Sequence, residues 1–107
     1  MNILVTGASK GIGNAIAHEL QNIGEVFVTG RNEKALIECN AKGFCVCDLS
    51  KDITTLTDFI EKNNIDVLIN NAGEYIYSDL DKMNIKDIQR LYQTNLIAPA
   101  FLASKVI

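Results

Sequence analysis

The sequence contains VTGASKGIG at residues 5–13, with three glycines in nine residues, between an apolar run and an amphipathic run. Because glycine has no Cβ, such a stretch can turn tightly and lets other groups approach the backbone. If a strand precedes it and a helix follows it, the exposed N–H groups and the dipole at the helix start favour an anion such as a phosphate. We expect Gly7 to permit the turn, Gly11 to admit a pyrophosphate and Gly13 to let the helix pack closely on the strand.

Strands are predicted wherever short runs are rich in Val, Ile, Leu and Phe, which occurs at residues 2–6, 26–30, 44–47 and 66–70. The apolar residues in these runs are continuous instead of alternating, which is typical of strands covered on both faces of a parallel sheet. Helical patterns separate the runs, so the predicted order is βαβαβαβ followed by a long helix. Residues 74–83 are expected to form a loop with one helical turn.

The first helix is predicted from apolar residues at intervals of four, four and three, namely Ile12, Ile16, Leu20 and Ile23. Gly24 is expected to end this helix. Asn32 and Ser50 are the expected N-caps of the second and third helices. Asn84 followed by Asp87 is similar to a capping box for the last helix.

Composition and charge narrow the class of protein. A chain of 107 residues with 48% hydrophobic content can form one domain over residues 1–107 with its own core. The net charge of −3 and the absence of a basic run argue against nucleic acid or an anionic membrane surface as partners. The apolar stretch at 96–107 is too short to cross a bilayer.

The three cysteines, Cys39, Cys45 and Cys47, form neither an even disulfide framework nor a metal-ligand pattern, so we expect buried reduced thiols and no metal site. The first predicted strand follows Met1 directly, which leaves no room for a signal peptide. A cytoplasmic location is therefore expected.

The second predicted strand ends in TGRN, close to where an adenosine ribose would lie. An acidic residue at this position is typical of NAD binding, but this chain has Arg31, whose guanidinium matches a phosphate. Lys10 could add a second positive charge, so the sequence favours NADP over NAD. Two alternatives stay open. The glycine spacing differs from the G-x-G-x-x-G pattern, so the glycines could be needed only for the shape of the turn and not for a ligand. Arg31 and Lys10 could also be ordinary surface residues.

TGASKGIG resembles the cofactor fingerprint of the short-chain dehydrogenase/reductase family. The stretches CDLS and NNAG resemble two further motifs of that family and follow in the same order along the chain. The resemblance covers essentially the whole chain. It implies that Asp48 holds the adenine amino group and that NNAG, residues 70–73, steadies the sheet and lines the cofactor. The cofactor-binding residues expected from loop chemistry and resemblance together are Gly7, Ser9, Lys10, Gly11, Ile12, Gly13, Arg31, Asp48, Leu49, Asn71, Ala72 and Gly73.

TNLIAPAF is similar to the family segment around a helix-borne catalytic asparagine, which corresponds to Asn95. Pro99 lies four residues later and has no N–H, so the Asn95 carbonyl loses its helical partner and the helix is expected to kink. The resemblance implies that this carbonyl holds a water in a proton relay. The alternative is that Asn95 only tolerates a kink that serves packing.

The family also uses a serine and a Tyr-x-x-x-Lys pair for proton transfer. None of Tyr75, Tyr77 and Tyr92 has a lysine four residues later, and Phe101 with Lys105 lacks the hydroxyl. No catalytic serine, tyrosine or lysine is therefore assigned, and the chain resembles the amino-terminal half of a family member. We expect no turnover from these 107 residues alone.

Together these features predict an α/β fold of the Rossmann type, a doubly wound parallel sheet truncated after about four strands in the order 3-2-1-4. The expected function is NADP-dependent interconversion of a small-molecule alcohol and a carbonyl compound. A non-catalytic NADP-binding module or a truncated, inactive product is the alternative. A methyltransferase-like site for S-adenosylmethionine is a third candidate, against which Arg31 argues.

An unpaired fourth strand and a last helix without neighbours would leave an exposed edge and apolar surface, including Phe101, Leu102, Val106 and Ile107. Such surfaces favour association. The sequence therefore predicts a homo-oligomer, or aggregation of the isolated chain.

Overall fold

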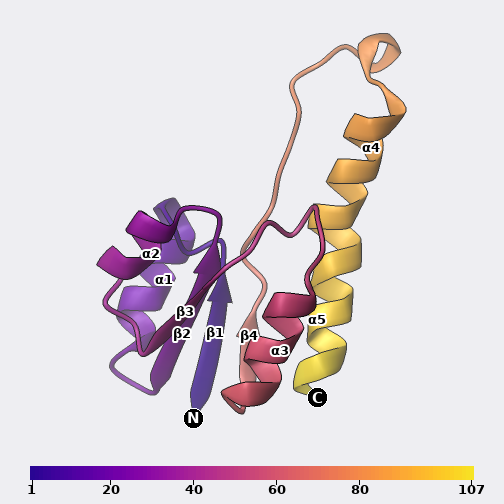
Figure 1. The fold of residues 1–107 in the computed structure, drawn as a ribbon. Coiled ribbons are helices and arrows are strands. Elements are labelled where there is room, and N and C mark those ends of the chain that lie inside the picture. The colour runs from indigo at the N-terminus through magenta and orange to yellow at the C-terminus, as the bar shows by residue number, and fades with distance from the viewer.

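The computed structural model describes residues 1–107, and its centre is a four-stranded parallel sheet (Figure 1). The strands are β1 (Asn2–Thr6), β2 (Glu25–Gly30), β3 (Gly43–Val46) and β4 (Val67–Ile69). Their order is β3-β2-β1-β4, which confirms the predicted order and the parallel arrangement. In register, Ile3 of β1 lies opposite Val26 of β2 on one side and Val67 of β4 on the other. All four strands therefore end at the same edge of the sheet.

Helices cover both faces of this sheet, as expected for right-handed crossovers between parallel strands. The helical segments of the chain are α1 (Gly11–Leu20), α2 (Glu33–Glu38), α3 (Thr54–Lys62), the 3₁₀ turn η1 (Leu80–Lys82), α4 (Ile85–Tyr92), the π-helix η2 (Gln93–Ile97) and α5 (Ala98–Val106). Figure 1 shows α1 and α2 on one side of the strands and α3 and α5 on the other. None of the helices has the combination of length and apolar composition that a membrane span needs.

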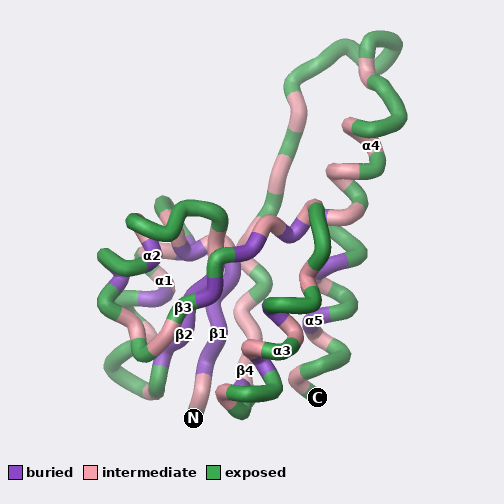
Figure 2. The backbone as a smooth tube through the Cα atoms, in the orientation of Figure 1, coloured by how far each residue is buried: buried purple, intermediate pink, exposed green.

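The core has two halves because successive residues of a strand point to opposite faces. Ile3 and Val5 of β1 pack with the cluster beneath α1 and α2, whereas Leu4 packs with the cluster beneath α3 and α5. Figure 2 shows the buried segments concentrated in the strands and the facing sides of these helices. The three cysteines are buried and free, as predicted. This two-sided burial explains why the strand sequences are continuously apolar.

The predicted apolar stripe on α1 is wrong in part. Gly13 and Ala17 are the buried residues of α1, and Ile12 and Ile23 are 74% and 64% exposed. The helix approaches the sheet closely through its two small residues, which turns Ile12 toward solvent. Ile23 lies beyond the end of the helix, in the turn before β2.

The predicted caps were confirmed for two helices. The Asn32 side chain accepts a hydrogen bond from the Ala35 N–H at 3.1 Å, and the Asn84 side chain accepts one from the Asp87 N–H at 2.8 Å. The prediction that Ser50 caps the third helix is wrong, because α3 begins at Thr54.

Asp52 accepts hydrogen bonds from the Thr54 N–H at 2.9 Å and from the Thr54 hydroxyl at 2.6 Å, ahead of α3. Both bonds lower the pKa of Asp52 below its ordinary value. The N-cap residue of α3 is Ile53, which makes no capping hydrogen bond through its side chain. Three polar residues precede it, Ser50, Lys51 and Asp52, and the sequence pattern alone does not indicate which of them bonds to the start of the helix.

The last helix is divided by the π-helical segment η2, where the Ala98 N–H donates to the Gln93 carbonyl. A π-turn is one of the known ways in which a helix accommodates a missing hydrogen bond. The distortion expected from Pro99 is thus found as a π-helix directly before it. The segment 74–83 is a loop with the single turn η1, as predicted, and Figure 1 shows it extending with α4 away from the sheet.

Candidate functional site

A cavity of about 950 Å³ opens at the carboxyl ends of the strands. Its walls come from four segments: the glycine loop after β1, the turn from β2 into α2, the loop after β3 and the loop after β4. In open parallel sheets, ligands bind in this position, between the two strands where the chain reverses its direction of travel. Here those strands are β1 and β4.

The three glycines of the first loop differ in geometry. Gly7 has φ +64°, and a Cβ there would lie 2.8 Å from the Ala72 Cα. A Cβ on Gly13 would collide with the Gly7 carbonyl and with the Asn71 side-chain amide. Gly11 has φ +61° but no atom within 4 Å of an added Cβ. Two glycines are therefore required by close packing, and the third leaves open space beside the start of α1.

Ser9 lies in the same loop, and its hydroxyl is buried without any hydrogen-bond partner. A Cβ on Gly30, at the end of β2, would collide with this hydroxyl. A buried hydroxyl that lacks a partner is unfavourable by about 1–3 kcal/mol. Since Ser9 lines the cavity, a polar ligand group can satisfy it. The loop thus fits a phosphate-bearing nucleotide, with open space at Gly11 and a free hydrogen-bonding group at Ser9.

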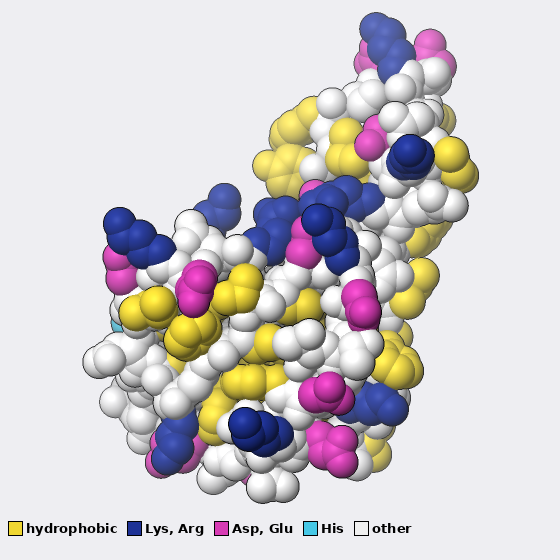
Figure 3. Space-filling view, viewed as in Figure 1, with side chains coloured by type: hydrophobic (Ala, Val, Ile, Leu, Met, Phe, Trp, Pro, Cys, Tyr) yellow, Lys and Arg dark blue, Asp and Glu magenta, His cyan; other side chains and the backbone are white.

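Positive side chains line the side of the cavity next to α2. Lys10, Arg31 and Lys34 all contribute to its walls and are exposed, and Glu33 is the acidic residue beside them. Figure 3 shows Lys and Arg side chains gathered along the upper edge of the sheet, from α2 across to the near end of α4. This part of the cavity therefore favours an anionic group.

Asp48 follows β3 and faces the same cavity. Its Oδ1 accepts hydrogen bonds from the Ser50 N–H at 2.9 Å and the Ser50 hydroxyl at 2.7 Å, and its Oδ2 lies 3.8 Å from the Arg90 guanidinium. Partial burial raises the pKa of Asp48, but the Ser50 hydrogen bonds and the charges of Arg90 and Arg31 outweigh it, so the pKa lies below its ordinary value. Asp48 is therefore an ionised hydrogen-bond acceptor.

Cys47 also lines the cavity, next to Asp48. Burial is the main reason why the pKa of the Cys47 thiol is raised to about 11, and the nearby Asp48 and Asp52 carboxylates add to it. Because the thiolate is the reactive form of cysteine, Cys47 is a neutral packing residue at neutral pH and not a nucleophile.

The NNAG segment is fastened to β1. The Thr6 hydroxyl accepts hydrogen bonds from the N–H groups of Asn71 and Ala72 at 3.1 and 3.0 Å. The Asn71 side-chain amide donates to the carbonyls of Thr6 and Gly7, both at 3.2 Å. Asn71 therefore connects the glycine loop to the loop after β4.

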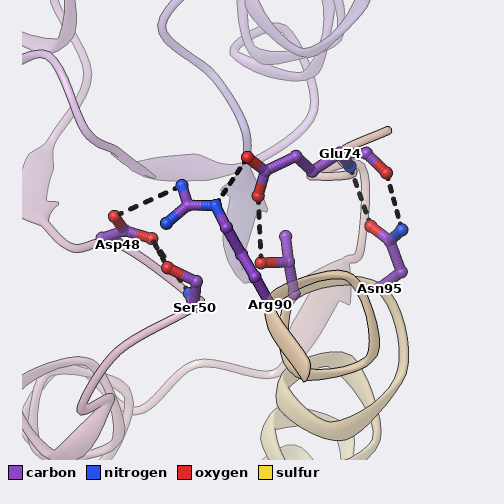
Figure 4. A network of polar contacts seen from close by, with 6 residues as sticks. Asp48, Ser50, Glu74, Arg90 and Asn95 are labelled. Carbon is purple, nitrogen blue, oxygen red and sulfur yellow. Dashed lines mark hydrogen bonds and ion pairs between the residues drawn. The ribbon is translucent and has the colours of Figure 1, made fainter. Parts of the chain in front are cut away.

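Asn95 lies in η2, is exposed and does not line the cavity itself. Its side chain pairs with the backbone of Glu74 in both directions. The Glu74 N–H donates to Asn95 Oδ1 at 2.8 Å, and Asn95 Nδ2 donates to the Glu74 carbonyl at 2.7 Å (Figure 4). This paired contact commits the amide group of Asn95 to holding the loop after β4.

The Glu74 side chain is held as well. Arg90 Nε donates to Glu74 Oε1 at 2.8 Å, and the Thr94 hydroxyl donates to Glu74 Oε2 at 3.3 Å. The hydrogen bond to Glu74 is the largest reason why the pKa of Arg90 is raised. Sequence reasoning did not find Glu74, Arg90 or Thr94 as site residues. The only available signal was the position of Glu74 directly after NNAG and of Arg90 five residues before Asn95.

The structure brings most of the expected cofactor-binding residues together around one cavity. The lining residues among them are Gly7, Ser9, Lys10, Gly11, Arg31, Asp48, Leu49, Asn71, Ala72 and Gly73. Ile12 points to solvent, and Gly13 lies beneath the loop as a packing residue. Asn95 reaches the cavity only through its contacts with Glu74.

Comparison with other proteins gives consistent relatives. A tropinone reductase homolog from Arabidopsis thaliana is 36% identical over 110 residues, spanning 90% of this chain and 41% of the relative. An uncharacterized short-chain type dehydrogenase/reductase from Sinorhizobium fredii is 41% identical over 98 residues, spanning 87% of this chain and 39% of the relative. The chain thus spans less than half the length of these curated relatives.

Solved structures agree with this comparison. An alcohol dehydrogenase from Comamonas testosteroni, described as specific for bulky-bulky ketones, matches with a TM-score of 0.89 and 25% identity, over 98% of this chain and 47% of that chain. A 3-oxoacyl (acyl-carrier-protein) reductase from Agrobacterium tumefaciens with NADP bound matches with a TM-score of 0.81 and 27% identity, over 99% of this chain and 46% of that chain.

The sequence profile of the family described as short chain dehydrogenase matches residues 1–107. The profile therefore covers the strands, the glycine loop, the NNAG segment and the helix that carries Asn95. On this evidence the chain belongs to the short chain dehydrogenase family of oxidoreductases, whose members bind NAD or NADP.

Proposed function

We propose that this chain forms the NADP(H)-binding part of an oxidoreductase that interconverts an alcohol and a carbonyl compound. The observation that carries the preference for NADP(H) is Arg31, which lines the cavity where an NAD-binding site of this type has a carboxylate. Lys10 and Lys34 line the same region and add positive charge. The proteins with NADP or NADPH bound among the structural neighbours are consistent with this proposal.

The roles of the chain's own residues follow from their contacts. The glycine loop and the Ser9 hydroxyl would receive the pyrophosphate side of the ligand, and Asp48 would accept from the adenine amino group. Arg31 and Lys10 would bind the 2′-phosphate. Asn71, Ala72 and Gly73 would form the wall beside the ribose that carries the nicotinamide.

The bound nicotinamide supplies hydride transfer to or from a carbon atom of the substrate. Asn95 would contribute through its main-chain carbonyl, since its amide group already pairs with Glu74 and Pro99 has no N–H to offer that carbonyl. We assign this carbonyl the role of holding a water for proton transfer. The alternative role of Asn95 is to hold the loop after β4 without taking part in proton transfer.

A second candidate function is NADP(H) binding without turnover. The residues four positions after Tyr75, Tyr77 and Tyr92 are Asp79, Asp81 and Leu96, so these 107 residues contain no Tyr-x-x-x-Lys. Both candidates require the same binding site, and they differ in whether NADPH is oxidised when carbonyl compounds are added.

The test is a fluorescence titration of the purified chain with NADPH and with NADH. We expect NADPH to bind more tightly than NADH. Arg31→Asp should lower the affinity for NADPH by about tenfold or more and the affinity for NADH much less, because a charge-assisted phosphate contact is lost. Lys62→Asp, at the end of α3 and the opposite edge of the sheet, is the control with the same charge change. Equal effects of Arg31→Asp on both cofactors, or no binding of either, would contradict the proposal.

A further inference from the structure

Arg90 of α4 lies between two carboxylates that belong to different loops of the cavity (Figure 4). Its Nε donates to Glu74 Oε1 at 2.8 Å, and its Nη2 lies 3.8 Å from Asp48 Oδ2. Asp48 follows β3 and Glu74 follows β4, so the two loops lie on opposite sides of the central strands β1 and β2. A single guanidinium therefore spans the outer parts of the cavity wall.

The three side chains are partly withdrawn from solvent, with 33% of the Arg90 side chain, 24% of Asp48 and 23% of Glu74 exposed. Fully exposed ion pairs contribute little to the free energy of folding, because water screens the charges and both side chains lose conformational freedom. A charge-assisted hydrogen bond at 2.8 Å between partly buried groups is stronger. We call the two contacts of Arg90, with Glu74 and with Asp48, the Arg90 bridge. The hydrogen bond to Glu74 is the stronger of the two, and the longer contact with Asp48 is mainly electrostatic.

Each carboxylate is also tied to a second group. Asp48 Oδ1 is occupied by Ser50, which leaves Oδ2 to face Arg90. Glu74 is held by Thr94 through its side chain and by Asn95 through its backbone. One ion pair and several hydrogen bonds therefore connect the loop after β3 with Asn95.

We propose that Arg90 is a positioning residue that couples these two loops and, through them, the adenine end of the cavity to the end near Asn95. The part of this inference that concerns a ligand rests on the proposed function. The coupling itself is a property of the protein alone. Arg90 holds Asp48 in the acceptor orientation and holds Glu74 where its N–H meets Asn95.

The first experiment needs no cofactor. Amide hydrogen exchange at the Glu74 N–H is followed by NMR in the unmodified chain, in Arg90→Gln and in Lys86→Gln, which removes the same charge from an exposed position of the same helix. We expect exchange at Glu74 to become about tenfold faster in Arg90→Gln and to be unchanged in Lys86→Gln. Unchanged exchange in Arg90→Gln would overturn the coupling.

A second substitution tests whether the coupling crosses from one loop to the other. Asp48→Asn removes the charge at the far end of the bridge, more than twenty residues from Glu74 in sequence. We expect it also to speed exchange at the Glu74 N–H, by about threefold, and to add nothing further in combination with Arg90→Gln. Independent, additive effects of the two substitutions would show that no coupling exists.

The cofactor experiment separates this inference from the proposed function. Arg90→Gln is expected to lower the affinities for NADPH and NADH by the same factor, about three- to tenfold. The reason is that Arg90 orients Asp48, which would contact the adenine that both cofactors share. Arg31→Asp instead discriminates between them. Failure of the unmodified chain to bind NADPH would overturn the proposed function and leave the exchange result to decide the coupling. Binding that is unaffected by Arg90→Gln would overturn the ligand part of the inference alone.

Discussion

Gly13 of α1 packs directly against the carbonyl of Gly7, so that an added Cβ would collide with the carbonyl oxygen and carbon. Gly7 is the first residue after β1 and lines the cavity, and Gly13 lies in the first turn of α1. The contact brings the start of the helix onto the end of β1. The position of the helix N-terminus beside the cavity therefore depends on a glycine that does not itself line the cavity.

Substitution of Gly13 by Ala is expected to lower the free energy of unfolding by about 3 kcal/mol, because the methyl group meets backbone atoms that cannot move aside. The measurement is urea-induced unfolding followed by circular dichroism. Gly11→Ala is the matched control in the same loop, because open space surrounds it and only its positive φ is strained, which costs about 1 kcal/mol. A larger loss for Gly11→Ala than for Gly13→Ala would contradict this account.

Ser9→Ala is expected to affect stability and binding in opposite directions. Removing a buried hydroxyl that has no partner should leave the free energy of unfolding unchanged or raise it by about 1 kcal/mol. The affinity for NADPH should fall by about fivefold, because the Ser9 hydroxyl would no longer be there to hydrogen-bond to the ligand. Denaturant unfolding and NADPH titration are measured on the same sample.

Ser78→Ala serves as the control for this comparison, because Ser78 is an exposed loop residue that donates only to the Asp79 carbonyl. It should change neither quantity appreciably. If Ser9→Ala lowers stability and leaves binding intact, the hydroxyl has a structural partner and is not available to a ligand.

The pKa of Asp48 should depend more on Ser50 than on Arg90. The Ser50 hydrogen bonds are the larger of the effects that lower this pKa, and the charge of Arg90 is a smaller one. We therefore expect Ser50→Ala to raise the pKa of Asp48 further than Arg90→Gln does, as measured by NMR titration of the carboxyl carbon.

The sign of the accompanying change in stability follows from the direction of the shift. Because the pKa of Asp48 is lower in the folded chain, the ionised carboxylate stabilises the fold above the pKa of the unfolded state, and this contribution is lost as the pH falls through the folded-state pKa. Ser50→Ala should thus be less stable than the unmodified chain at neutral pH, with the difference shrinking in acid. A constant difference across this range would show that Ser50 acts by packing alone.

Self-association is expected for the 107-residue chain. β4 pairs only with β1, and apolar side chains remain exposed along the last helices, including Tyr92 (59%), Leu96 (58%) and Phe101 (47%). The expectation that Leu102 is exposed is wrong, because it packs in the core. Figure 3 shows hydrophobic side chains gathered over the loop before α4 and along the outer side of α5. Light scattering should report species larger than a monomer, and Leu96→Lys should reduce them. A monodisperse monomer would contradict this prediction.

The sheet and the glycine loop could be predicted because their causes are local in the sequence. Continuous apolar runs such as 2–6 need burial on both faces, and Asn32 meets its partner only three residues later. The turn at Gly7 and the close packing at Gly13 could be predicted, since both follow from where a strand turns into a helix. The role of Gly11 in admitting a pyrophosphate stays a prediction.

The bridge through Arg90 could not be predicted, because its partners are distant in sequence and no motif connects them. Arg90 lies 16 residues from Glu74 and on another element from Asp48. Their meeting depends on how α4 is placed against the loops after β3 and β4. The apolar stripe on α1 failed for a related reason: the depth at which a helix packs is decided by its small residues, here Gly13 and Ala17, and periodicity of large residues does not reveal it.

The π-helical segment Gln93–Ile97 holds one residue more than a regular helical turn, because the hydrogen bond from the Ala98 N–H to the Gln93 carbonyl spans five residues. Such a turn takes up its additional residue locally, so deleting one residue from this segment would restore a regular helix and leave α4 and α5 nearly in phase. Arg90 of α4 could then keep its contact with Glu74, and Leu102 of α5 could keep its place in the core. In a family alignment, an insertion or deletion confined to these five residues should therefore leave the residue types at positions 74 and 90 unchanged.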